Sequence, residues 1–166
     1  MTDDIPNPIV SVTAPEALGD ELARGLRTRA EVPGKGVIGF AKALSLDQDR
    51  LQVELVYLSI VTTQFALGVA LGTDEPCARV GVALERALWS GPPWRASAAG
   101  LTARLREYRD AFNHPHPELG RAYVIGRTFA RHCHCSHEIA VIEFGGRAYM
   151  DQLSLTIALL KSVTLR

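Results

Sequence analysis

The chain has 166 residues, and its 18 lysines and arginines balance its 18 aspartates and glutamates. This length favours one domain with a substantial core. The charge balance leaves no global field that would attract a phosphate backbone, so we expect no nucleic acid partner. Three cysteines do not make a disulfide framework, and they fit reduced thiols in a cytoplasmic protein.

We expect a flexible leader over residues 1–12, followed by a single helical domain over residues 13–166. The leader contains two prolines and lacks the basic region and apolar run of a secretory signal. Thr13 and Glu16 then match a capping box, and leucines recur behind them at four-residue spacing. This pattern predicts a first amphipathic helix that covers the core.

The segment 34–39 reads Gly-Lys-Gly-Val-Ile-Gly, which matches the Gly-x-Gly-x-x-Gly pattern of dinucleotide-binding loops. That motif binds phosphate only between a buried strand and a helix N-terminus, and residues 27–33 do not resemble a strand. We therefore predict a flexible loop, in which Lys35 is placed to meet an anion. Residues 37–40 are the one stretch with some strand character.

A long apolar segment without charged side chains follows Glu54 and continues to Gly72. Large residues point in every direction around such a helix, so either other helices or a bilayer must enclose it. Its hydrogen-bonding side chains and its lack of aromatic belts favour helices, with no membrane. We predict a buried central helix over residues 46–71, begun by a second capping box at Ser45 and Gln48. Near its start, Glu54 is expected to reach solvent or an arginine rather than to act as a general base.

Further amphipathic stripes predict helices over residues 73–89, 95–112 and 117–131. In the second of these helices, basic and acidic residues alternate on the face that carries Arg104. Such mixed charge indicates a solvated face rather than a phosphate-binding one.

After residue 136 we expect a short helix that Gly145 and Gly146 end, and then a last apolar helix over residues 147–163. The fold prediction is therefore all-α. It is a single-domain bundle of six or seven helices around the buried central helix.

All five histidines and two of the three cysteines lie between residues 114 and 137. Imidazole and thiolate are ligands that suit zinc or another soft transition metal. The metal hypothesis takes its ligands from one short segment: His132, Cys133, His134, Cys135 and His137. His114 and His116 do not belong to the same site, because an intervening helix would hold them about 20 Å away.

The spacing of these residues matches no common metal motif. Cys133 and Cys135 are two positions apart, which is not zinc-finger spacing. His137 begins a His-Glu-x-x-His pattern, but Val141 stands where its second histidine belongs. Two other interpretations stay open: Cys133 as a buried structural residue, and Cys135 as a nucleophile with His134 or His137 as its base.

The functional expectation is a non-enzymatic interaction or scaffold module that forms a homo-oligomer and binds an unknown protein partner. It rests on more apolar residues than one stripe per helix needs, notably over residues 153–163. We expect no cofactor. The alternative is a zinc-binding sensor or small enzyme that uses residues 133–137. A small-molecule pocket lined by Glu54, Tyr57 or Tyr123 is a third interpretation.

Overall fold

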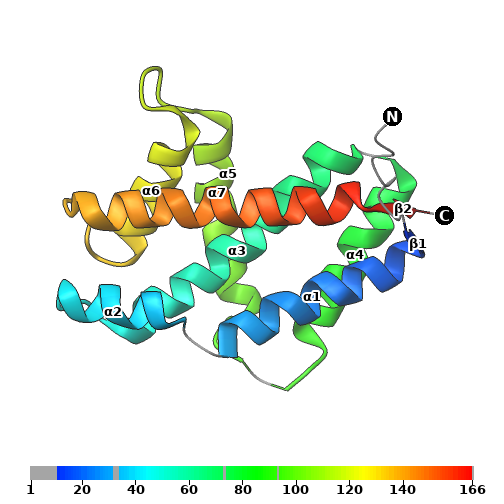
Figure 1. Ribbon diagram of the computed structural model, residues 1–166, viewed down its shortest axis with the longest axis horizontal. Coiled ribbons are helices and arrows are strands. Elements are labelled where there is room, and N and C mark those ends of the chain that lie inside the picture. The colour runs from blue at the N-terminus through cyan, green and yellow to red at the C-terminus, as the bar shows by residue number, and fades with distance from the viewer. Residues whose placement is uncertain (1–10, 32–33, 73, 93, 166) are drawn as a thin grey trace, which may run out of the picture.

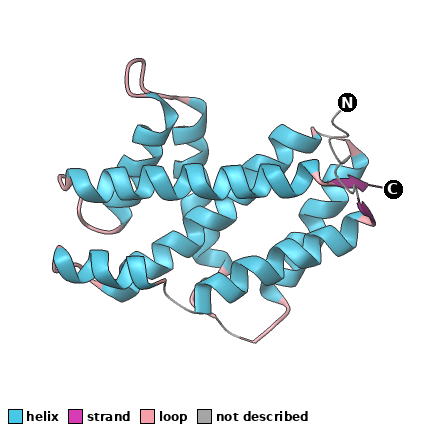
Figure 2. Ribbon diagram, viewed as in Figure 1, coloured by secondary structure: helices cyan, strands magenta, loops and turns pink. Residues whose placement is uncertain are grey.

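This computed structural model describes residues 11–31, 34–72, 74–92 and 94–165. These residues contain seven helices and two short strands, joined by loops (Figure 1). The helices are α1 (Pro15–Glu31), α2 (Lys35–Ala43), α3 (Gln48–Leu71), α4 (Glu75–Trp89), α5 (Ala98–Asn113), α6 (Gly120–His132) and α7 (Ile139–Lys161). The strands are β1 (Ser11–Thr13) and β2 (Val163–Leu165). Figure 2 shows how strongly helix dominates. The predicted all-α bundle around a central helix is confirmed.

Helix α3 crosses the middle of the molecule and contacts each of the other six helices (Figure 1). Its start is set by Asp47, whose side chain accepts a hydrogen bond from the backbone N–H of Arg50 at 3.0 Å. The helix therefore begins at Gln48, slightly later than predicted, and Ser45 lies in the preceding turn with a φ of 53°. Gly72, with a φ of 73°, ends the helix as expected.

Among the described helices, α3 is the one whose length and composition would suit a membrane span. Of its most apolar 18-residue stretch, 56% is buried inside the molecule. The core helix of a globular domain and a transmembrane helix share such a composition. In this structure α3 contacts all six other helices, as the sequence predicts for a segment enclosed by helices.

Glycines let two helix pairs pack closely on either side of α3. Where α1 meets α4, a Cβ added at Gly19 would lie 2.6 Å from the carbonyl oxygen of Val80. Where α6 meets α7, a Cβ at Gly126 would lie 2.0 Å from the carbonyl oxygen of Ile142. Both distances are far below van der Waals contact, so the two crossings require glycine at these positions.

Helix α7 is continuous, so the predicted helix end at Gly145 and Gly146 is wrong. Both glycines are buried where α6 packs against α7. A Cβ at Gly145 would lie 2.6 Å from the ring of Phe129, and one at Gly146 would lie 2.7 Å from the carbonyl oxygen of Ala122. A glycine costs a helix about 1 kcal/mol relative to alanine. Close packing of the helix pair outweighs that cost here.

Residues 35–43 form α2, so the predicted loop and the strand character of residues 37–40 are both wrong. The ring of Phe40 stacks on that of Phe144 in α7, with centroids 4.3 Å apart, and Ala41 is buried. These contacts stabilise a helix that its glycines disfavour. The segment before the glycines is helix α1, which ends at Glu31, so the dinucleotide motif lacks the strand that it needs.

The two strands join the ends of the described chain. β1 pairs in parallel with β2, with Ser11 opposite Val163. Residues 11 and 12, expected to belong to a flexible leader, therefore lie in a strand, and residues 1–10 of that leader lie outside the described residues. Thr13 also lies in β1, and α1 begins at Pro15.

Candidate functional site

The segment predicted to bind metal begins where α6 ends. His132 is the last residue of the helix, and its Nε2 lies 3.2 Å from a carboxylate oxygen of Glu107 on α5. Cys133 caps the helix and packs into the hydrophobic core, where it is 8% exposed. The thiol of Cys135 then donates to the carbonyl of Cys133, and its backbone N–H donates to the carbonyl of Ala130.

The remaining predicted ligands, His134 and His137, are exposed. His134 has a φ of 60° and forms part of the turn after α6. Within residues 11–31, 34–72, 74–92 and 94–165, no three His, Cys, Asp or Glu side chains form a group able to hold a metal ion. The structure therefore does not bring three of the five predicted ligands together.

The surroundings of both thiols favour the protonated form. Burial raises the pKa of Cys133 strongly, and the carboxylate of Glu54 raises it further. Burial also raises the pKa of Cys135, with a smaller contribution from Glu138. Zinc binding and nucleophilic attack both use the thiolate. The environment of Cys135 thus lacks the lowered pKa that a nucleophile needs.

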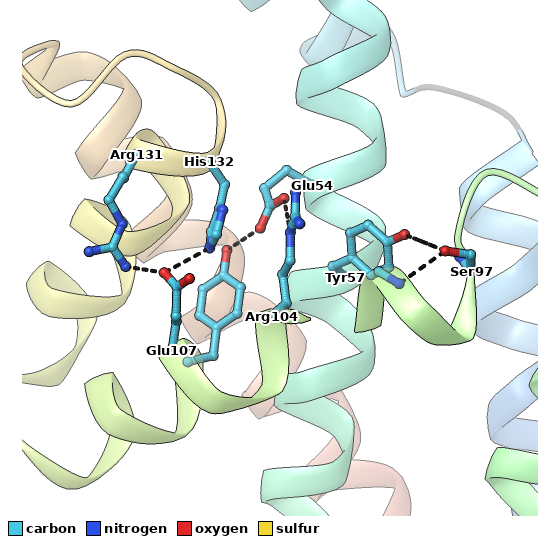
Figure 3. Close-up of polar contacts among 9 residues, drawn as sticks. Glu54, Tyr57, Ser97, Arg104, Glu107, Arg131 and His132 are labelled. Carbon is cyan, nitrogen blue, oxygen red and sulfur yellow. Dashed lines mark hydrogen bonds and ion pairs between the residues drawn. The ribbon is translucent and has the colours of Figure 1, made fainter. Parts of the chain in front are cut away.

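A buried network of polar contacts lies beside this segment, centred on Glu54 of α3 (Figure 3). The carboxylate of Glu54 is 1% exposed and accepts hydrogen bonds from the hydroxyl of Tyr108 at 2.8 Å and from Nε of Arg104 at 3.0 Å. Both donors come from one face of α5, because they are four residues apart. The expectation that Glu54 reaches an arginine is confirmed. The predicted solvated position of Arg104 is wrong, since its side chain is only 26% exposed.

Tyr57 of α3 holds the start of α5 (Figure 3). Its hydroxyl accepts a hydrogen bond from the backbone N–H of Ser97 at 3.1 Å, and the Ser97 hydroxyl accepts one from the N–H of Gly100 at 3.0 Å. A Cβ at Gly100 would lie 2.0 Å from the Tyr57 oxygen, so this contact requires glycine. The guanidinium of Arg104 lies over the Tyr57 ring, 5.2 Å from its centroid. These contacts fix the position of α5 along α3.

Toward the surface, beside this network, Glu107 of α5 contacts α6. Its carboxylate pairs with the guanidinium of Arg131 and lies beside His132 (Figure 3). The imidazole Nε2 is close to this carboxylate but does not form a hydrogen bond with it. Burial lowers the pKa of His132, which favours the neutral form of the ring.

The protonation and burial of these groups suit a structural contact between helices. Burial raises the pKa of Tyr108 well above its usual range, and the charge of Glu54 raises it further, so the hydroxyl stays protonated and donates to the carboxylate. A general base has to reach a proton on its substrate. The carboxylate of Glu54 is 1% exposed and already bound by two donors, so the network joins α3 to α5 instead.

Two of the hollows at the surface involve α6. A groove of about 1140 Å³ lies between α5 and α6, is lined by arginines of both helices, and includes the pair Glu107 and Arg131. A smaller hollow of about 460 Å³ lies between α6 and α7 and is lined mainly by apolar side chains.

Sequence reasoning identified Glu54 but missed its partner Tyr108. The signal was present in the spacing. Arg104 and Tyr108 stand at i and i+4 in a helical pattern, and Glu54 is the last charged residue before a long uncharged segment. A carboxylate buried there needs donors, and a helix face that carries an arginine and a tyrosine supplies two.

No protein-family model matches this chain, and no curated protein or solved structure shows a significant match to it.

Proposed function

We propose that this chain is a non-enzymatic interaction module that self-associates through the α6–α7 face, the surface around the hollow between these two helices. What supports the proposal is a stripe of four outward-facing residues on α7 at helical spacing: Ile139, Glu143, Arg147 and Met150. Ile139 is 70% exposed and Met150 is 46% exposed. Large apolar side chains exposed beside an apolar hollow are typical of a protein interaction surface.

The hollow beside the stripe has a shape and chemistry that suit an apolar side chain from another molecule. Tyr123 of α6 lines it together with Ile142 and Met150 of α7, and the charged residues Glu143 and Arg147 of the stripe line it as well. Its volume of about 460 Å³ exceeds that of any single side chain. Filling it would remove exposed apolar area from water, which is the main driving force of association.

The charges of the stripe favour a second copy of this chain as the occupant. Glu143 and Arg147 are exposed, and neither forms an ion pair within the described part of the chain. In a two-fold symmetric dimer every contact occurs twice, so a surface must complement itself. Two antiparallel copies of α7 would place Glu143 of each copy opposite Arg147 of the other.

Charge reversal tests this arrangement. We expect Glu143→Arg and Arg147→Glu each to weaken self-association by on the order of tenfold, because each variant places like charges opposite each other. An equimolar mixture of the two variants should associate again, since one chain then carries two arginines and the other two glutamates. Analytical ultracentrifugation measures all three samples, with the exposed Glu85→Arg of α4 as a control of similar charge change.

Two results would reject the proposal. One is a wild-type chain that stays monomeric up to about 1 mM, where even weak specific dimers form. The other is a mixture of the two variants that associates no better than either variant alone.

The zinc alternative and the cytoplasmic location stay predictions. Elemental analysis of untagged protein tests zinc directly, with Cys133→Ser plus Cys135→Ser as the comparison. A stoichiometric metal that this double variant loses would support the alternative.

A further inference from the structure

The groove between α5 and α6 has the chemistry of a binding site that self-association does not use. The two helices form a hairpin whose connected ends project beyond α7 in Figure 1. The groove on this hairpin has a volume of about 1140 Å³ and is open along its length to solvent. Its apolar floor includes Leu105 of α5 and Val124 of α6, both partly buried.

Arginines border this floor on both sides. Arg106 and Arg109 come from α5, and Arg127 and Arg131 come from α6. The spacings of three and four residues place each pair on one face of its helix. The two helices therefore present two basic rows that flank one apolar strip.

Three of these four arginines form no ion pair with a described residue. Arg131 pairs with Glu107, and the carboxylate of Asp110 lies 3.0 Å from Nδ1 of His114. Arg106, Arg109 and Arg127 form no ion pair with any described residue. Four arginines against two carboxylates give the groove a formal charge of +2, in a chain whose net charge is zero.

We propose that this groove binds an acidic amphipathic helix of a partner protein. The apolar face of such a helix would cover the floor, and its carboxylates would meet the two rows of arginines, which bind carboxylates in a bidentate manner. A nucleic acid fits less well, because Glu107 and Asp110 line the same groove and would repel a continuous phosphate backbone. A helix places its charges individually, so it can leave neutral residues opposite these two carboxylates.

The test uses a synthetic helical peptide of about 20 residues, with leucines at i, i+3, i+4 and i+7 and glutamates beside them. Fluorescence anisotropy measures its binding to the full chain. The comparison probes are a scrambled peptide of the same composition and a single-stranded DNA oligonucleotide. We expect the amphipathic peptide to bind at least about tenfold more tightly than either, because only it matches both the floor and the rows.

A pair of matched variants locates the site. Arg106→Glu plus Arg127→Glu should weaken peptide binding by at least about tenfold, since it reverses one arginine in each row. Arg24→Glu plus Lys161→Glu makes the same change in net charge at exposed positions outside the groove and should leave binding unchanged. Hydrogen exchange on the wild-type chain should show peptide-dependent protection on α5 and α6, a readout that does not depend on how the variants fold.

Equal loss of binding in both double variants, or protection elsewhere on the molecule, would overturn the proposal. So would equal affinity for the scrambled peptide or tighter binding of the DNA. Self-association is read separately with Glu143→Arg, which lies outside the groove, so either proposal can fail while the other holds.

Discussion

At the scale of single residues, Glu54 decides how α5 lies on α3. A buried carboxylate without donors is very costly, so only positions of α5 that bring Arg104 and Tyr108 to it are favourable. We infer that this ion pair contributes specificity to the fold as well as stability.

Replacing Glu54 tests this role. We expect Glu54→Gln to lower the free energy of unfolding by about 2–4 kcal/mol, because it leaves the guanidinium of Arg104 largely buried without its counter-charge. Urea denaturation followed by circular dichroism measures the difference. The matched control is Asp49→Asn on the same helix, whose ion pair with Arg95 is exposed and should contribute less than about 1 kcal/mol. A Glu54→Gln variant as stable as this control would show that the buried pair is not needed.

At the scale of helices, small residues rather than complementary large ones set the two tightest crossings. Gly19 of α1 and Gly126 of α6 each bring a neighbouring backbone within a distance that no side chain permits. Helices in such contact pack with little freedom to rotate or slide.

A comparison of two glycines in α1 tests this claim. We expect Gly19→Ala to destabilise the protein by about 1–3 kcal/mol, because its Cβ would overlap the backbone of α4. Gly25→Ala should instead stabilise it by about 0.5–1 kcal/mol. Gly25 is exposed, and a Cβ added there would have no atom within 4 Å, so the substitution only reduces the backbone entropy that is lost on folding. Thermal unfolding of both variants gives the two signs. The same sign for both would mean that helix propensity, not the crossing, governs α1.

The same glycines show what the sequence could and could not predict. Hydrophobic periodicity identified most helices and the enclosed central one, because burial against a core imposes that pattern. Gly145 and Gly146 predicted a helix end, since glycine is a common C-terminal signal. In the structure the two glycines make room for α6, and that contact forms only when the chain folds. Local pattern cannot separate a glycine that ends a helix from one that admits a neighbour.

The candidate site was predictable to a similar extent. The histidine and cysteine residues stand out as a cluster in the sequence, but the turn after α6 directs Cys133 into the core and leaves His134 exposed. The charges that line the α5–α6 groove looked like an ordinary solvated face. Only the packing of α6 beside α5 brings Arg127 and Arg131 near the arginines of α5. Surfaces made by two helices are not visible in either helix alone.

At the scale of the whole molecule, the helices differ widely in how many of their residues are buried. Helix α3 contacts all six others and is buried along most of its length. Helix α2 lies at one end of the molecule in Figure 1 and has a single fully buried residue, Ala41. Regions with few buried apolar contacts open locally at low free energy, without unfolding of the rest. The molecule should therefore unfold first at α2 and last at α3.

Native-state hydrogen exchange tests this order. We expect the slowest amides in α3 and the fastest helical amides in α2. Phe40→Ala should speed exchange in α2 by about tenfold while leaving α3 unchanged, because it removes the ring stacked on Phe144 that holds α2 to α7. Ile38→Ala is the control within the same helix, since Ile38 is 41% exposed and should have little effect. Equal acceleration of α2 and α3 by Phe40→Ala would instead show that both helices unfold as one cooperative unit.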